Sequence, residues 1–81
     1  MRYGGWVVRA DALRALRRRR GESQREFGRP LGVAQGTVAR WENGTRSPVF
    51  TDVQARAMAD ALGVDVRKVF KHVPPSKGVA A

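Results

Sequence analysis

Only three residues, LGV at positions 31–33, separate two predicted helices near the middle of this chain. The first helix begins after Ser23, because the segment SQRE forms a capping box in which Ser23 caps the amide of Glu26 and Glu26 reaches back. The second helix is expected at Ala34–Glu42. So short a connection, with a glycine at its centre, keeps consecutive helices in contact and makes a tight turn between them.

Three more helices are expected around this pair. One is Ala12–Arg20, with Asp11 as its N-cap. A second capping box, TDVQ at residues 51–54, begins another, and Asp65 can cap the last. Glycines end or separate these segments at Gly21, Gly32, Gly44 and Gly63. Apolar residues at helical spacing supply the buried faces: Leu13, Leu16, Phe27, Leu31, Val38, Trp41, Ala55, Met58, Ala59, Leu62, Val66, Val69 and Phe70.

These segments predict a compact, all-α domain of five helices over residues 10–71. Residues 1–9 are expected to form an N-terminal arm, whose apolar residues 6–8 could pack as a short extended segment against the core. Residues 72–81 have no core-forming pattern and are expected to be a flexible C-terminal tail. Pro30 should shorten or kink the second helix, because proline cannot donate the helical hydrogen bond.

The charge of the chain favours a polyanionic partner. Sixteen basic residues face seven acidic ones, which gives a net charge of +9 in 81 residues. Thirteen of the sixteen are arginine, whose guanidinium pairs with phosphate and with the edge of guanine. Nucleic acid is therefore the first expectation. An anionic membrane surface is the second, and it lacks the support of a strongly amphipathic basic helix with a large apolar face.

Other function classes lack their usual residues. The chain has no cysteine and one histidine, His72, so we expect no metal site. It has no nucleophile constellation and no phosphate-binding loop either, so we expect no cofactor and no enzymatic activity. No apolar run approaches the length of a membrane span, and the start, MRYGGWVV, is a poor signal peptide. The expectation is a soluble protein in the cytoplasm of a bacterial host.

Residues 24–43, QREFGRPLGVAQGTVARWEN, resemble the helix-turn-helix of the phage lambda repressor and Cro family. The segments LRALR, SQRE, RSP and MADALGV extend the resemblance over about Ala10 to Phe70 in the right order. Gly28 stands where the family usually has alanine, and Ala34 replaces the common serine or threonine cap. The resemblance implies a lambda-repressor-like fold whose helix-turn-helix motif occupies about 24–43.

The resemblance also implies a set of DNA contacts. Gln24 would bind a backbone phosphate, and Gln35 would read a base as the first such position of the recognition helix. A glutamine amide can pair with adenine N6 and N7. Arg40 suits guanine O6 and N7, with a plain phosphate contact about as plausible. The full implied DNA-binding set is Ser23, Gln24, Gln35, Gly36, Thr37, Ala39, Arg40, Asn43 and Arg46.

The segment LRALRRRRG, residues 13–21, raises the question of what its arginines do. Leu13 and Leu16 have the spacing of a buried helical face, and Arg17 lies four residues after Leu13, so it should turn inward. A buried arginine needs a partner. In the family an arginine of the first helix pairs with the glutamate that ends the third helix. The resemblance therefore implies a salt bridge between Arg17 and Glu42.

These expectations favour a sequence-specific, double-stranded DNA-binding transcriptional regulator of phage or prophage repressor or Cro type, which acts by operator occupation. A weak homodimer, formed on DNA, is expected to contact through the N-terminal segment Tyr3–Val8 or through residues 69–73, and the C-terminal side is favoured. The alternative is an antitoxin-like module that binds a toxin protein and DNA as well.

Overall fold

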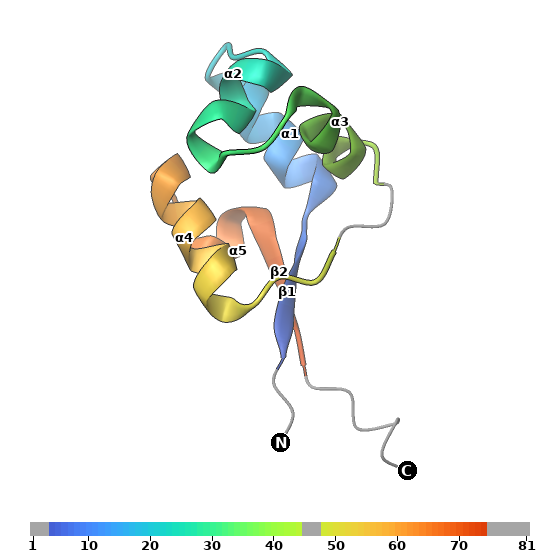
Figure 1. Cartoon of the computed structure of the whole chain (residues 1–81), viewed down its shortest axis with the longest axis vertical. Coiled ribbons are helices and arrows are strands. Elements are labelled where there is room, and N and C mark those ends of the chain that lie inside the picture. Colours follow the sequence, from blue (N-terminus) through green and yellow to red (C-terminus); the bar gives the residue numbers. More distant parts are fainter. Residues whose placement is uncertain (1–3, 45–47, 75–81) are drawn as a thin grey trace.

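A computed structural model describes residues 4–44 and 48–74 of the 81-residue chain (Figure 1). The described elements, in chain order, are β1 (Gly5–Val8), α1 (Ala10–Arg19), α2 (Gln24–Gly28), the 3-10 helix η1 (Arg29–Leu31), α3 (Gln35–Glu42), α4 (Asp52–Leu62), α5 (Val66–Val69) and β2 (Phe70–Val73). Five α-helices were expected and are present in the described residues. The expectation of an all-α fold is wrong in one respect, because β1 and β2 form a two-stranded sheet.

The two strands are antiparallel, with Gly5 opposite Val73. On its other edge β1 is bridged to the segment before α4: the Trp6 N–H donates to the Phe50 carbonyl at 2.9 Å, and the Phe50 N–H donates to the Trp6 carbonyl at 2.8 Å. A Cβ at Gly5 would lie 2.3 Å from Val49 Cγ1. Glycine at this position therefore lets the loop before α4 cross the strand closely.

Strand formation corrects two boundaries expected from sequence. Phe70 was assigned to the last helix and His72 to a flexible tail, but both belong to β2. The strand β1 lies in the expected N-terminal arm, and its Trp6 side chain is only 2% exposed. The Trp6 indole N–H donates to Asp52 Oδ1 at 2.9 Å, which ties β1 to the start of α4. Residues 75–81 of the expected tail lie outside the described residues.

Helix α2 begins and ends as its sequence indicates. Ser23 Oγ accepts the Glu26 N–H at 3.0 Å, and Glu26 Oε1 accepts the Ser23 N–H at 2.8 Å, so the capping box is formed. The α-helix ends at Gly28, and the chain continues through Pro30 as the single 3-10 turn η1. A Cβ on Gly28 would lie 2.7 Å from the Val33 carbonyl oxygen, so this glycine permits the close return of the chain toward α3.

Helix α1 starts two residues earlier than expected, and Asp11 is not its N-cap. Arg9 occupies the cap position without a side-chain cap, and its backbone N–H donates to the Val69 carbonyl at 2.8 Å. Asp11 instead forms an ion pair with Arg14 at 2.8 Å in the first turn. The end of the strand pair, rather than a local side chain, therefore sets where this helix begins.

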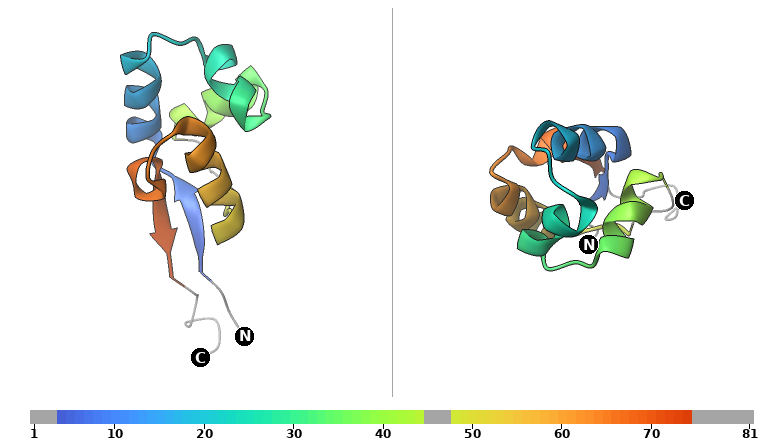
Figure 2. Two further views of the ribbon diagram at one scale, coloured as in Figure 1. Left: turned by 90° about the vertical axis from the view of Figure 1, so that its left-hand side faces the viewer. Right: turned by 90° about the horizontal axis from the view of Figure 1, so that it is seen from above.

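One hydrophobic core joins the helices and the strands. Its fully buried members include Phe27, Leu13, Val38 and Val69, and Trp41 and Phe70 contribute aromatic rings that meet Phe50 edge to face. Figures 1 and 2 show α1, α2 and α3 at one end of the molecule and the strand pair at the other. None of the helices in the described part of the chain has the length and apolar character needed to cross a membrane.

Candidate DNA-binding surface

Helices α2 and α3 form a helix-turn-helix in which η1 and residues 32–34 make the connection. Gly32 has a φ of +72°, a left-handed conformation that glycine adopts without strain. Helix α3 begins at Gln35, one residue later than expected, and Ala34 at the cap position has no side chain with which to cap it. The connection is therefore longer than the three residues expected, because α2 ends at Gly28, but the predicted glycine turn at Gly32 is present.

Helix α3 divides into an inner and an outer face. Val38, Trp41 and Glu42 are buried, as the spacing of the first two predicted. The residues that the resemblance assigned to DNA lie on the remaining surface: Gln35, Gly36, Arg40 and Asn43 are exposed, and Thr37 and Ala39 are partly exposed. The arrangement brings these side chains to one outward face of a single helix.

Two side chains on the outer face of α3 are joined by a weak hydrogen bond. Arg40 Nη2 donates to Thr37 Oγ1 at 3.4 Å, a long hydrogen bond that a ligand can replace. A Cβ at Gly36 would meet nothing closer than Arg40 Nη1 at 4.0 Å, so the fold itself does not require glycine there. Asn43 is the exposed C-cap of α3, and Arg46 lies outside the described residues.

Gln24 and Ser23 lie at the start of α2 and have partners within the chain. Gln24 Nε2 donates to Glu42 Oε1 at 3.2 Å, so its side chain bridges α2 and α3. A glutamine amide has a second N–H and a carbonyl oxygen, and these remain able to bind a ligand. The Ser23 hydroxyl accepts the Glu26 N–H, and a hydroxyl that accepts one hydrogen bond can still donate another.

A bidentate ion pair links α1 to the end of α3. Arg17 Nε lies 2.6 Å from Glu42 Oε2, and Arg17 Nη2 lies 2.9 Å from Glu42 Oε1. The exposed fraction of the Glu42 side chain is 2% and that of Arg17 is 15%. Burial raises the pKa of Glu42, but hydrogen bonds from Arg17 and Gln24 lower it more, so the pKa lies below its usual value. The hydrogen bond to Glu42 raises the pKa of Arg17.

Arg14 of α1 and Arg20, the C-cap of α1, each bind the end of another helix, and sequence reasoning missed both contacts. Arg14 Nη1 donates to the Glu42 carbonyl at 3.1 Å, and Arg20 Nη2 donates to the Leu62 carbonyl. These cations lie at the C-terminal ends of α3 and α4, where the helix dipole favours positive charge. The signal was present in the sequence, because Arg14, Arg17 and Arg20 are spaced three apart along one side of the helix.

Comparison with known proteins identifies the family. The profile of a helix-turn-helix domain family matches residues 10–69, which is most of the chain. The chain therefore belongs to this helix-turn-helix family of DNA-binding domains. A crystal structure of the transcriptional regulator VanUg, form II, is similar with a TM-score of 0.56 and 20% identity, over 86% of this chain and 89% of that one. This likeness is one of fold. The curated protein sequences contain no match to the chain.

Proposed function

We propose that this chain is a sequence-specific, double-stranded DNA-binding transcriptional regulator that acts by occupying an operator. The observation that carries the proposal is the outward face of α3, where Gln35, Arg40 and Asn43 are exposed while the opposite face is buried. In a helix-turn-helix the second helix lies in the major groove and the first crosses the DNA backbone. The chain would act as a phage or prophage repressor or Cro-type protein in the cytoplasm of a bacterial host.

The side chains of α3 divide the work of recognition. Gln35, in the first turn, pairs with an adenine edge, and Arg40 binds a guanine edge or a phosphate one turn further on. Gly36 lets the backbone approach the bases between them, which agrees with the open space around it. The bidentate pair between Arg17 and Glu42 keeps α3 at a fixed angle to α1, so these side chains are presented in a constant orientation.

A two-fold dimer completes the proposal, because one recognition helix reads too few base pairs for a selective site. Two such helices lie about 34 Å apart on a near-palindromic site. Trp6, Val69 and Phe70, from the two segments expected to form the contact, are buried within one chain, and Tyr3 lies outside the described residues. The apolar surface left in these segments is small, which supports a dimer that is weak in solution and forms on DNA.

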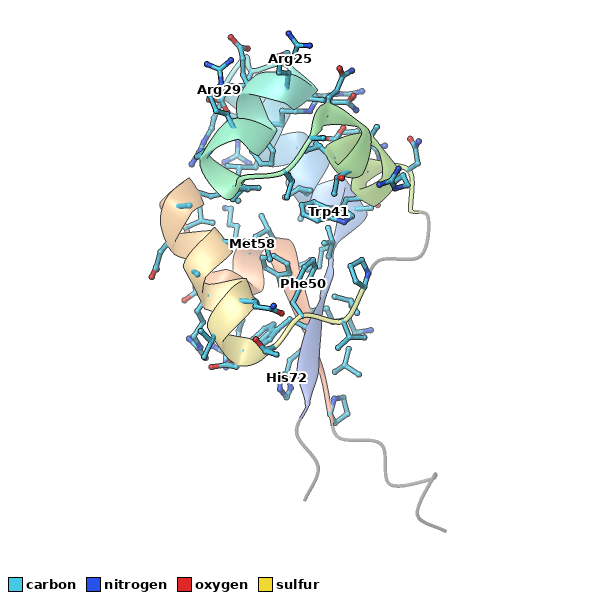
Figure 3. All side chains as sticks on the ribbon, viewed as in Figure 1. Arg25, Arg29, Trp41, Phe50, Met58 and His72 are labelled. Carbon is cyan, nitrogen blue, oxygen red and sulfur yellow. The ribbon has the colours of Figure 1, made fainter. Side chains whose placement is uncertain are left out.

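A second candidate function is an antitoxin-like module that binds a protein as well as DNA. Val49 and Val53 favour it, because they are 64% and 77% exposed. A shallow hollow of about 280 Å³ is lined by Phe50, Gln54, Ala57 and Met58. Figure 3 shows Phe50 and Met58 on the face between α4 and the helix-turn-helix. Exposed apolar patches often mark surfaces that bind another protein.

Selection of bound sites from random duplex DNA tests the leading proposal. The expected result is enrichment of a palindrome or of a half-site, and a loss of preference at one position when Gln35→Ala is used in place of the original chain. Absence of any enriched sequence would overturn sequence-specific regulation. That result would favour the antitoxin-like function or binding to DNA of any sequence.

A further inference from the structure

Two arginines of the helix-turn-helix, Arg25 and Arg29, lie outside α3 and are not among the side chains proposed to read bases. They are four residues apart, on α2 and at the start of η1, so they share one side of this segment. Both are exposed. Figure 3 shows them pointing outward at the end of the molecule where α2 lies and α3 begins, away from the strand pair.

No acidic side chain in the described part of the chain forms an ion pair within 4 Å with either arginine. In residues 4–44 and 48–74 the ion pairs within 4 Å join Arg14 to Asp11, Arg17 to Glu42 and Arg56 to Asp52. The nearest carboxylate in sequence, that of Glu26, accepts the Ser23 N–H at 2.8 Å in the capping box. The charge of Arg29 makes only the smallest contribution to the lowered pKa of Glu26, and the two side chains form no direct ion pair. Arg25 and Arg29 therefore present their guanidinium groups to the surroundings rather than to the fold.

In the described part of the chain neither the Arg25 nor the Arg29 side chain donates a hydrogen bond to the fold. The pattern differs from that of Arg14 and Arg20, each of which donates to a carbonyl at a helix end.

We propose that Arg25 and Arg29 bind phosphate oxygens of the DNA backbone that flanks the base pairs facing α3. This inference rests on the proposed function, because it is the crossing of the backbone by the first helix that brings these side chains to phosphates. A guanidinium binds phosphate with two parallel hydrogen bonds. Such contacts hold the protein in position and raise affinity, but they carry no sequence information.

The salt dependence of DNA binding tests the proposal. The full chain and the variant Arg25→Ala/Arg29→Ala are titrated against a fluorescein-labelled duplex of mixed sequence, by fluorescence anisotropy at several salt concentrations. Each phosphate neutralised contributes about −0.9 to the slope of log K against log salt, so the variant slope should be less steep by about 1.8. The loss of affinity should be the same for duplexes of different sequence.

The variant Arg67→Ala/Lys68→Ala is the matched control, because it removes the same two charges from exposed positions on α5. Its slope should equal that of the original chain. A second variant, Arg25→Gln/Arg29→Gln, keeps polar helix-forming side chains and should show the same change of slope as the alanine variant, with unaltered thermal melting.

Three results would count against the proposal. An unchanged slope for the variants of Arg25 and Arg29 overturns it and leaves these arginines to a partner other than DNA. An equal change in the control variant overturns it as well, because the effect would then be one of net charge. If the original chain does not bind duplex DNA at low salt, the proposed function fails, and this inference fails with it.

Discussion

Replacing Arg17 by alanine should destabilise the domain far more than replacing the neighbouring Arg18. The Glu42 side chain is 2% exposed, and two of the hydrogen bonds to its carboxylate come from Arg17. Without Arg17 the carboxylate keeps the bond from Gln24 alone. Removing one partner of a buried pair typically costs ~3–5 kcal/mol. Because Arg17 is 15% exposed and water can reach the site, we expect the lower end of this range, about 3 kcal/mol.

Thermal unfolding followed by circular dichroism measures the difference. In a domain of this size 1 kcal/mol shifts Tm by roughly 4–8 °C, so Arg17→Ala should lower Tm by about 12 °C or more. Arg18 and Arg19 are exposed, and Arg18→Ala or Arg19→Ala should change the stability by no more than about 0.5 kcal/mol. Similar decreases for all three variants would refute the assignment of Arg17 as the buried partner.

The pH dependence of the same measurement gives a second readout. In the folded chain the pKa of Glu42 is lowered, so its carboxylate stabilises the fold above the unfolded pKa of about 4.3, and this stabilisation is lost as the pH falls through the folded pKa. In Arg17→Ala burial is opposed only by the hydrogen bond from Gln24 and the charge of Arg14, so the pKa of Glu42 should rise and protonation should relieve the penalty. The Tm difference between variant and original chain should therefore shrink between about pH 7 and about pH 4. A constant difference over this range would contradict the mechanism.

Three further predictions concern recognition, packing and assembly. Gln35→Ala should weaken the free energy of DNA binding by about 1–3 kcal/mol on a duplex that carries the preferred base, and by little on duplexes with another base at that position. Binding to duplexes that differ at this one position measures the difference. Gly5→Ala should lower Tm, because its Cβ would lie 2.3 Å from Val49 Cγ1. Gly36→Ala, whose Cβ has no neighbour closer than 4.0 Å, should keep or raise Tm and weaken DNA binding. Sedimentation at saturating protein should find two chains per palindromic duplex, and a strict one-to-one complex would exclude pairing on DNA.

The helix starts with a capping box and the glycine turns were predictable from the sequence because their signals are local. Both capping boxes, SQRE and TDVQ, form as expected, since each needs only residues three apart. The glycines assigned to helix ends and turns have φ between +66° and +74°: Gly21, Gly32, Gly44 and Gly63. The inward turn of Val38 and Trp41 was predictable for the same reason, and it fixed which side of α3 faces outward.

The strand pair was not predictable because its partners are far apart in the sequence. Val8 lies opposite Phe70, and no local pattern indicates that pairing. Phe70 also continues the helical spacing of Val66 and Val69, so it fits the helix as well as the strand. The start of α1 was misplaced for the same reason, since Arg9 is held by a bond to Val69 from the other end of the chain. Contacts between distant segments overrode local preference at these positions.

The pairing of β1 with β2 also decides where other protein can be attached to this domain. Gly5 and Val73 are partners, at the end of the molecule opposite to α2 and α3 (Figure 1). A polypeptide fused before Gly4 or after Pro74 would therefore leave from nearly the same place, on the side away from the candidate DNA-binding surface. A reporter or a second domain joined directly at Gly4 or at Pro74 would therefore not stand between α3 and a duplex.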